Sequence, residues 1–275
     1  MIDLHCHSSF SDGVLSPAEL LNKAIGANVK VLALTDHDTV AGLEALHEAA
    51  QGHAIQIING IEFSACWKKY DVHIIGLNIN LSDKAIQSLI ERQNQSRIHR
   101  ALQIAKQMEA CGVADAYKKA CDIAGHKRVG RPHFAQVFVN EKIVADLQAA
   151  FKRFLGRGRP AYVRTPWLTL TEAVEGIVQA NGQAVLAHPL KYSLTNTRLQ
   201  QLITAFKEAG GNGLEVVSGE MNKVQIQEMA GLCQRFQLLG STGSDYHGDT
   251  LSRISLGRQP QLPVNCMPIW HQWNI

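Results

Sequence analysis

Histidine and carboxylate residues recur with a spacing of two near both ends of the chain. One residue separates His5 from His7, and one residue separates Asp245 from His247. In an extended strand, residues two apart point to the same side, so each pair presents two ligand atoms together. Imidazole and carboxylate ligands suit zinc, manganese or iron rather than calcium. A single pair could be chance or a hydrogen-bonded core contact, but two pairs favour a metal site.

Other histidines and acids follow short apolar runs. His37 lies in the sequence Thr35-Asp36-His37-Asp38, and Glu62 could bridge two cations because a carboxylate has two oxygens. Single histidines such as His73 and His188 are more often structural than ligating. The complete set of candidate metal ligands is His5, His7, Asp12, His37, Glu62, His73, His188, Asp245 and His247.

The roles of three further acids near this set are left open by the sequence. Asp36 and Asp38 could be ligands, groups that orient His37, or helix caps, and we favour the last two roles. Glu215 is either an ordinary polar strand residue or a residue near the site.

The elements that must position these side chains are short β-rich runs that alternate with amphipathic stretches. We expect seven parallel strands at residues 2–6, 29–35, 55–62, 72–78, 184–188, 214–218 and 238–242. Ser16-Pro17-Ala18-Glu19 predicts a capped helix start, and Thr171-Glu172 predicts another helix that Gly182 ends. Strand and helix alternation of this length favours a closed α/β barrel, which gathers functional groups at the carboxyl ends of its strands.

The alternation lapses in the middle of the chain, which predicts a helical lobe inserted into the barrel. We expect the first part of the barrel at residues 1–90, the lobe at 91–164 and the second part of the barrel at 165–275. Ile98, Ala101, Leu102, Ala105 and Met108 follow helical periodicity. Residues 92–164 contain fifteen Lys or Arg against five acids, so the rest of the chain is net acidic.

This basic lobe has two interpretations. It could be a solvated helix surface, or it could contact phosphate groups. Arg131 and His133 in Val129-Gly-Arg131-Pro-His133, with Arg157 and Arg159 in Gly156-Arg-Gly-Arg159-Pro, favour phosphate contact, because guanidinium groups match phosphate oxygens.

The bulk composition is that of an ordinary globular protein. The chain has 275 residues, 45% of them hydrophobic, and a formal net charge of +3. Six scattered cysteines without a CxxC pair predict reduced, mostly buried thiols. No signal peptide and no run long enough to cross a bilayer is evident, so we expect a cytoplasmic protein with no membrane contact and no obligate protein partner.

Taken in order, the motifs resemble those of the PHP (polymerase and histidinol phosphatase) superfamily. They are HxH with a following Asp, TDHD, GxE, a single His, HP and a closing SDYH, and they extend over essentially the whole chain. The resemblance implies a distorted seven-stranded β/α barrel with three cations. It implies one cation at His5, His7, Glu62 and Asp245, a second at Glu62, His73 and His188, and a third at Asp12, His37 and His247.

Within the superfamily, the basic insertion and the SDYH ending are most similar to a group of nucleoside 3′,5′-bisphosphate phosphatases and 5′-to-3′ exoribonucleases. This similarity implies Mn²⁺, with Zn²⁺, Fe²⁺ or Mg²⁺ as alternatives, and a nucleotide or 5′-phosphorylated RNA as substrate. Our hypothesis is that a metal-activated water attacks phosphorus, while Asp12 or His247 protonates the leaving group. Arg131 and His133 would grip the phosphate, assisted by Arg157 or Arg159.

Three other functions remain open at this point. A histidinol-phosphate phosphatase would share the metal motifs, but the basic insertion argues against it. A metal-dependent deaminase or amidase would need a modified bridging lysine, for which only Lys68 and Lys69 lie between Glu62 and His73. A non-catalytic nucleic-acid-binding module would not require the intact ligand set.

Overall fold

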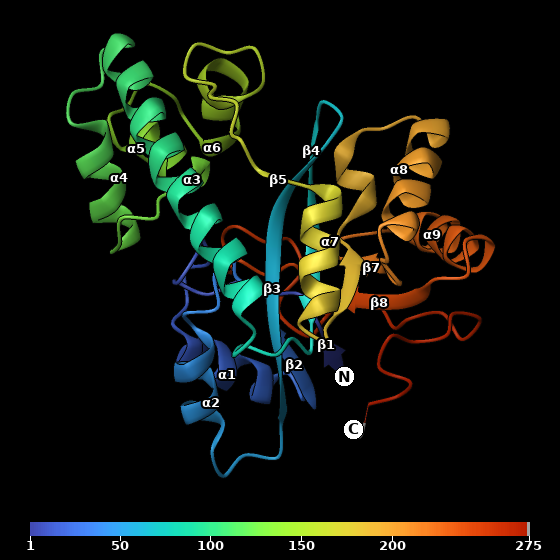
Figure 1. The fold of residues 1–275 in the computed structure, drawn as a ribbon. Helices are drawn as coiled ribbons and strands as arrows, with labels where there is room; N and C mark the ends of the chain where they lie inside the picture. Colours follow the sequence, from blue (N-terminus) through green and yellow to red (C-terminus); the bar gives the residue numbers. More distant parts are fainter. Residues whose placement is uncertain (274–275) are drawn as a thin grey trace. The chain divides into compact units, whose positions relative to one another are not determined.

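The computed structural model describes residues 1–273 and contains a sheet that curls into a nearly closed barrel (Figure 1). In order of pairing its strands are β1 (Ile2–Asp3), β2 (Val31–Leu34), β3 (Gln56–Trp67), β4 (Tyr70–Leu77), β6 (Gln183–Leu186), β7 (Gly213–Ser218) and β8 (Leu239–Gly243). A short strand, β5 (Leu168–Thr169), pairs with β3 beside this path. The two edges meet where Leu4 N–H donates to the carbonyl of Thr242. The predicted seven-stranded α/β barrel is confirmed.

The expectation that all the strands are parallel was wrong for one of them. Strand β4 runs antiparallel to both β3 and β6. Only Lys68 and Lys69 lie between β3 and β4, and Lys68 takes a left-handed conformation with φ 55°. Parallel neighbours need a crossover connection of a dozen or more residues, so this short link permits only a hairpin.

The helices of the barrel flank the strands. They are α1 (Pro17–Gly26), α2 (Leu43–Ala50), α7 (Leu170–Gln179), the 3₁₀ turn η2 (Pro189–Tyr192), α8 (Asn196–Glu208) and α9 (Lys223–Arg235). The capping box at Ser16 begins α1 as predicted. Helix α7 begins earlier than predicted, because Thr169 rather than Thr171 forms a capping box with Glu172.

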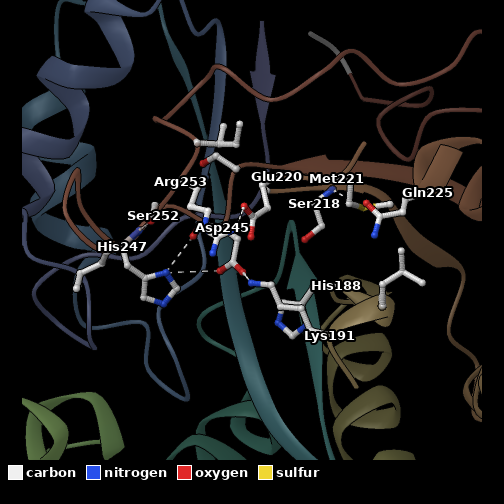
Figure 2. A pocket seen from close by; sticks show the side chains of 15 residues that line it. His188, Lys191, Ser218, Glu220, Met221, Gln225, Asp245, His247, Ser252 and Arg253 are labelled. Carbon is white, nitrogen blue, oxygen red and sulfur yellow. Dashed lines mark hydrogen bonds and ion pairs between the residues drawn. The ribbon is translucent and has the colours of Figure 1, made fainter. Parts of the chain in front are cut away.

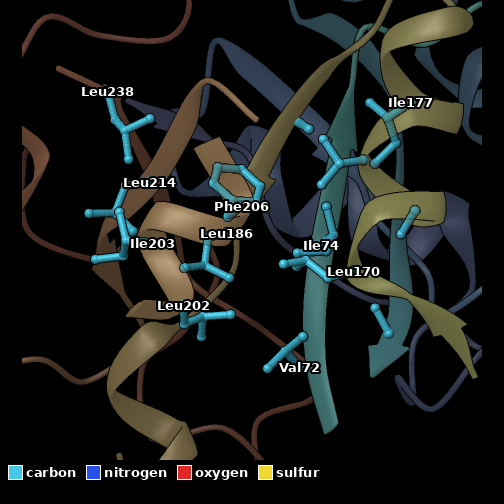
Figure 3. Close-up of a cluster of buried hydrophobic side chains, with 14 of the residues drawn as sticks. Val72, Ile74, Leu170, Ile177, Leu186, Leu202, Ile203, Phe206, Leu214 and Leu238 are labelled. Carbon is cyan, nitrogen blue, oxygen red and sulfur yellow. The ribbon is translucent and has the colours of Figure 1, made fainter. Parts of the chain in front are cut away.

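An apolar core between the sheet and its helices holds the barrel together (Figure 3). Ile74 of β4, Ile177 of α7 and Phe206 of α8 are completely buried in this cluster. Truncating one such Phe to Ala costs about 3–5 kcal/mol in typical cores. This packing holds the strands in place, and it therefore also positions the side chains at the strand ends.

The inserted segment forms a second compact unit, Glu91–Trp167, with its own core. Its elements are the remainder of α3 (Lys84–Ala110), α4 (Ala116–Ala124), α5 (Arg131–Asn140), α6 (Leu147–Ala150) and the π-helical turn η1 (Phe151–Leu155). The guanidinium carbons of Arg97 and Arg100 lie 5.3 and 5.0 Å from the ring centroid of Trp167, which ties that residue to this unit.

The helical periodicity of the inserted segment holds only in part. Ala101, Ala105 and Met108 are buried as expected, whereas Ile98 and Leu102 are 37% and 48% exposed. Within residues 1–273, none of the helices combines the length and the apolar character needed to span a membrane.

Candidate metal centre

The residues that follow β1 place two imidazoles at one point of the barrel rim. The chain stays extended there, because Cys6 forms a parallel bridge with Tyr246 and His7 N–H donates to the Tyr246 carbonyl. The Cys6 thiol points the other way and donates to the carbonyl of Ala33, 3.2 Å away. His5 and His7 are both completely buried, with their Nε2 atoms 3.1 Å apart.

Two carboxylates complete this first group of donors. The Nε2 atoms of His5 and His7 lie 3.4 and 3.3 Å from Glu62 Oε2. Both Nε2 atoms also lie 3.4 Å from Asp245 Oδ1. A tetrahedral ion with metal–ligand bonds of about 2.0–2.1 Å separates its ligands by roughly 3.3–3.4 Å. His5, His7 and Asp245 therefore have the spacing of a metal site, and Glu62 Oε2 lies beside both imidazoles.

The second oxygen of Glu62 faces another pair of imidazoles. Glu62 Oε1 lies 2.9 Å from His73 Nδ1 and 2.9 Å from His188 Nε2, and these two nitrogens are 3.3 Å apart. His188 lies two residues after the end of β6 and adopts an unusual backbone conformation with φ 24°. Strained backbone of this kind is concentrated at functional sites.

Asp12, His37 and His247 form a third group beside His7. Asp12 Oδ1 lies 3.3 Å from His247 Nε2, and Asp12 Oδ2 lies 3.7 Å from His37 Nε2. His7 Nδ1 lies 4.0 Å from Asp12 Oδ1. All nine candidate ligands identified in the sequence thus fall into contiguous groups that could each hold a cation.

The buried charges favour the ligand forms of Glu62, Asp245 and His7, whereas neighbouring carboxylates outweigh burial and raise the pKa of His5 and, to about 9, that of His247. Burial alone raises the pKa of the Glu62 carboxyl, but the surrounding imidazoles, His73 foremost, hold it well below its ordinary value. Burial also raises the pKa of Asp245, which His5 and Lys191 hold well below its usual range. Burial lowers the pKa of His7 to about 3. Ionised carboxylates and neutral imidazole are the states that bind metal.

One buried oxygen fits a cation in particular. Glu62 Oε2 is inaccessible to solvent and accepts no hydrogen bond among residues 1–273, although imidazole nitrogens surround it, with His37 Nδ1 the nearest at 3.0 Å. A buried carboxylate oxygen without a partner is costly, whereas a cation would satisfy it. Together with the spacing of the imidazoles, this oxygen shows that the residues present fit bound metal ions.

Glu215 contacts His5 on the side of the ring that faces away from the other donors of the first group. The sequence left this role open. His5 Nδ1 lies 2.9 Å from Glu215 Oε1, and His188 N–H donates to Glu215 Oε2 at 2.5 Å. Glu215 is completely buried in β7. The signal in the sequence was a single charge within an otherwise apolar strand, because such charges are almost never buried unless paired.

Asp36 and Asp38 lie outside the potential ligand groups. Asp36 accepts hydrogen bonds from Ser8 Oγ at 2.6 Å and from Ser11 Oγ at 2.5 Å, which secures the loop that leads to Asp12. Burial raises the pKa of Asp36 to about 6, although these hydroxyl groups lower it. Asp38 Oδ1 accepts from the backbone N–H of Ser64 at 2.7 Å. The helix-cap prediction was wrong for both, because α2 begins after Gly42.

A pocket of about 350 Å³ opens beside the metal-ligand candidates (Figure 2). Figure 2 shows Lys191 reaching Asp245, with which it forms an ion pair, and Ser218 on the wall nearby. Ser218 Oγ is buried and lacks a hydrogen-bond partner in the part of the chain that the structure describes. Sequence reasoning missed both residues, since an isolated Lys or Ser carries no recognisable pattern.

The predicted phosphate-binding residues lie in the second unit. The segment Arg131-Pro132-His133 forms the first turn of α5 rather than a loop, and His133 Nδ1 accepts from Gly130 N–H at 3.0 Å. The Arg131 guanidinium lies 6.0 Å from the ring of Phe151. Arg157 and Arg159 are exposed in the segment after η1.

Comparison with known proteins decides the family. The PHP domain model matches residues 3–219. The chain belongs to the PHP domain family.

Relatives of this PHP chain cover almost its full length. A 5′-3′ exoribonuclease of Haemophilus influenzae is 39% identical, with 98% of each chain aligned. A 3′,5′-nucleoside bisphosphate phosphatase of Chromobacterium violaceum is 37% identical over 98% of this chain and 95% of its own. The solved structure of an amidohydrolase from Chromobacterium violaceum, with bound sulfate and no metal, is 37% identical, covers 98% and 95% of the two chains, and superposes with a TM-score of 0.93.

Proposed function

We propose that this protein is a metal-dependent phosphoesterase that hydrolyses phosphate esters of nucleotides, as a 5′-3′ exoribonuclease, a nucleoside 3′,5′-bisphosphate phosphatase, or both. The observation that carries the proposal is Glu62, whose two oxygens each face a separate set of imidazoles. The relatives named as an exoribonuclease and as a bisphosphate phosphatase support the nucleotide substrate. The sulfate in the related structure supports an affinity for tetrahedral oxyanions.

Three cations would be held by the three groups of donors, with Mn²⁺ as the favoured metal. His5, His7, Glu62 and Asp245 would hold the first, Glu62, His73 and His188 the second, and Asp12, His37 and His247 the third. Bound divalent cations lower the pKa of water toward neutrality and stabilise negative charge on phosphate oxygens.

The chain's own side chains would carry out the remaining steps. Asp12 and His247 are 3.3 Å apart at the edge of the site. Burial raises the pKa of the Asp12 carboxyl, but His37 and His247 hold it well below its ordinary value, so His247 is the better candidate to deliver a proton to the leaving oxygen. Lys191, whose side chain is 58% exposed, lies beside Asp245 and could hold a phosphate oxygen. The adjoining pocket of about 350 Å³ has both polar and apolar walls, which suits the nucleoside part of a substrate.

The lobe would contribute phosphate contacts of its own. Arg131, Arg157 and Arg159 can form bidentate hydrogen bonds with phosphate oxygens, and His133 begins the same helix as Arg131. We retain these four residues as proposed substrate-binding groups.

The amidase alternative has little support from the barrel. Lys68 and Lys69 occupy the turn between β3 and β4, and Lys68 Nζ contacts Gln201 Oε1 at 3.4 Å. Both lysines line a hollow beside α8 rather than the pocket that His188 and Asp245 line. A modified lysine that bridges two cations is therefore not available from this segment.

Hydrolysis assays with Mn²⁺ would test the proposed function. The substrates are a nucleoside 3′,5′-bisphosphate, a short 5′-phosphorylated RNA and histidinol phosphate, each with the wild type and with His7→Ala. We expect the wild type to cleave one or both nucleotide substrates, and His7→Ala to lose at least 100-fold in kcat. Equal cleavage by both proteins would refute the site, whereas selective cleavage of histidinol phosphate would refute the substrate class.

A further inference from the structure

A second hollow lies on the barrel, away from the pocket beside the ligand groups. It measures about 510 Å³ and lies between the β3–β4 turn and the start of α8. Its walls are formed by Trp67, Lys68, Lys69, Tyr70, Thr195, Thr197, Arg198 and Gln201. Except for Trp67 and Tyr70, these side chains are exposed. The hollow is therefore a surface feature that a large ligand could reach.

The charge of this hollow is one-sided. Lys68, Lys69 and Arg198 contribute positive charge, and the described walls include no carboxylate. The neighbouring Asp71 does not line the hollow, as expected because successive strand residues point to opposite faces. The first turn of α8 also lacks acids, and the positive end of the helix dipole lies here. The surface is complementary to a polyanion.

Aromatic rings are interleaved with these cations. Trp67 and Tyr70 are cross-strand partners whose rings stack at 6.0 Å. Lys68 Nζ lies 4.6 Å from the Trp67 ring, and the Arg198 guanidinium lies 5.8 Å from the Tyr70 ring and contacts its hydroxyl. These contacts hold the cations in place at the rim. Positively charged grooves that follow the backbone are typical of surfaces that bind single-stranded nucleic acid. Here the aromatic rings order the cations, since Trp67 is only 7% exposed and is not available for base stacking.

Both walls of the hollow lie close in the sequence to candidate metal ligands. Tyr70 precedes His73 by three residues in β4, a distance of about 10 Å at the usual strand rise of 3.3 Å per residue. The other wall begins at Thr195, seven residues after His188. A strand of RNA whose end lies at the ligand groups could therefore also reach the hollow.

We propose that this hollow binds the phosphodiester backbone of an RNA substrate just beyond the nucleotide that is cleaved. The proposal rests on the proposed function and deepens it, because it separates recognition of RNA from recognition of a mononucleotide. A nucleoside bisphosphate has no phosphodiester backbone beyond its own nucleotide to place in the hollow. The hollow would therefore lower the KM for RNA without affecting the bisphosphate.

The test compares the wild type with a double variant that carries both Lys68→Ala and Arg198→Ala, and it uses two substrates. These are a 5′-phosphorylated RNA of about ten nucleotides and a nucleoside 3′,5′-bisphosphate, both with Mn²⁺. The matched control is Lys30→Ala with Arg258→Ala, which removes two exposed cations elsewhere on the barrel. We expect kcat/KM for RNA to fall roughly tenfold in the test variant only, with unchanged turnover of the bisphosphate.

Salt dependence provides a second measurement. Loss of two phosphate contacts should make the slope of log KM for RNA against log salt concentration shallower by about 1.4, since each contact with a single strand contributes about 0.7. Equal losses on both substrates, or an unchanged KM for RNA, would overturn the proposal.

A binding experiment separates this proposal from the proposed function. If the wild type cleaves neither substrate, the proposed function fails. Fluorescence anisotropy with a labelled RNA in EDTA would still measure the affinity of the hollow for RNA. Weaker binding by Lys68→Ala with Arg198→Ala than by the control supports the hollow, and equal binding overturns it.

Discussion

Glu215 holds the imidazole of His5 from the side opposite the candidate metal ligands. Glu215 Oε1 lies 2.9 Å from His5 Nδ1, while His5 Nε2 lies 3.4 Å from both Glu62 Oε2 and Asp245 Oδ1. A proton on Nδ1 that is donated to Glu215 leaves the lone pair of Nε2 directed at these carboxylates. The His5 imidazole would thus lie between the Glu215 carboxylate and the bound cation.

Replacement of Glu215 by Gln should therefore weaken metal binding without removing a ligand. We expect a 10- to 100-fold loss of affinity for Mn²⁺, with activity partly restored at high Mn²⁺, as is usual for residues that orient a ligand. Titration calorimetry measures the affinity. Glu228→Gln, an exposed change in α9, is the matched control. An unaltered Mn²⁺ affinity in Glu215→Gln would contradict the positioning role.

Gly243 at the end of β8 leaves room for His5. A Cβ at this position would lie 2.2 Å from the Cβ of His5 and 2.9 Å from its backbone nitrogen. Gly243→Ala must therefore displace the strand that carries the first imidazole. We expect it to lower the free energy of unfolding by about 1–3 kcal/mol, as overpacking usually does, and to weaken Mn²⁺ binding.

Gly231→Ala provides the matched control for Gly243→Ala. Gly231 lies within α9, and a Cβ there would meet nothing within 4 Å. In an open helical position, Ala in place of Gly stabilises by about 0.5–1 kcal/mol. Urea unfolding should show opposite signs for the two variants. Equal effects would mean that the close approach to His5 does not constrain the strand.

Removal of metal should lower the thermal stability of the protein. A ligand present at 100 times its Kd stabilises the folded state by about 2.7 kcal/mol, and 1 kcal/mol corresponds to about 2–4 °C for a chain of this size class. We expect EDTA to lower Tm by roughly 5–10 °C, measured by circular dichroism. The shift should shrink in His7→Ala, which lacks one donor. An identical Tm with and without EDTA would argue against bound cations.

The parts of the site that the sequence could predict are those whose signal is local. The spacing of His5 and His7 on one strand face follows from strand geometry alone, and the structure turns Cys6 to the opposite side. The barrel followed from the alternation of strands and helices. The resemblance to a known superfamily grouped donors such as Glu62 and His188, which are far apart in the chain and contact each other in the fold.

The parts that were missed depend on tertiary structure. The antiparallel direction of β4 follows from the two-residue link at Lys68 and Lys69, which was not apparent because the strands were expected to end at residue 62 and to begin at residue 72, whereas β3 extends to Trp67 and β4 begins at Tyr70. The role of Glu215 depends on β7 lying beside the segment that carries His188, and Lys191 matters only because η2 brings it to Asp245. No local pattern encodes such contacts between neighbouring elements.

Arg131 offers the sharpest test of whether the basic lobe recognises phosphate. Arg131→Ala should lower kcat/KM for a 5′-phosphorylated RNA by about 10- to 100-fold, the size of a lost charge-assisted hydrogen bond. Arg131→Lys should recover only part of this loss, because an ammonium group keeps the charge but not the planar fork. Lys152→Ala, an exposed change in the same unit, should have no effect. Full activity in Arg131→Ala, with activity lost in His7→Ala, would keep the metal centre and remove Arg131 from substrate recognition.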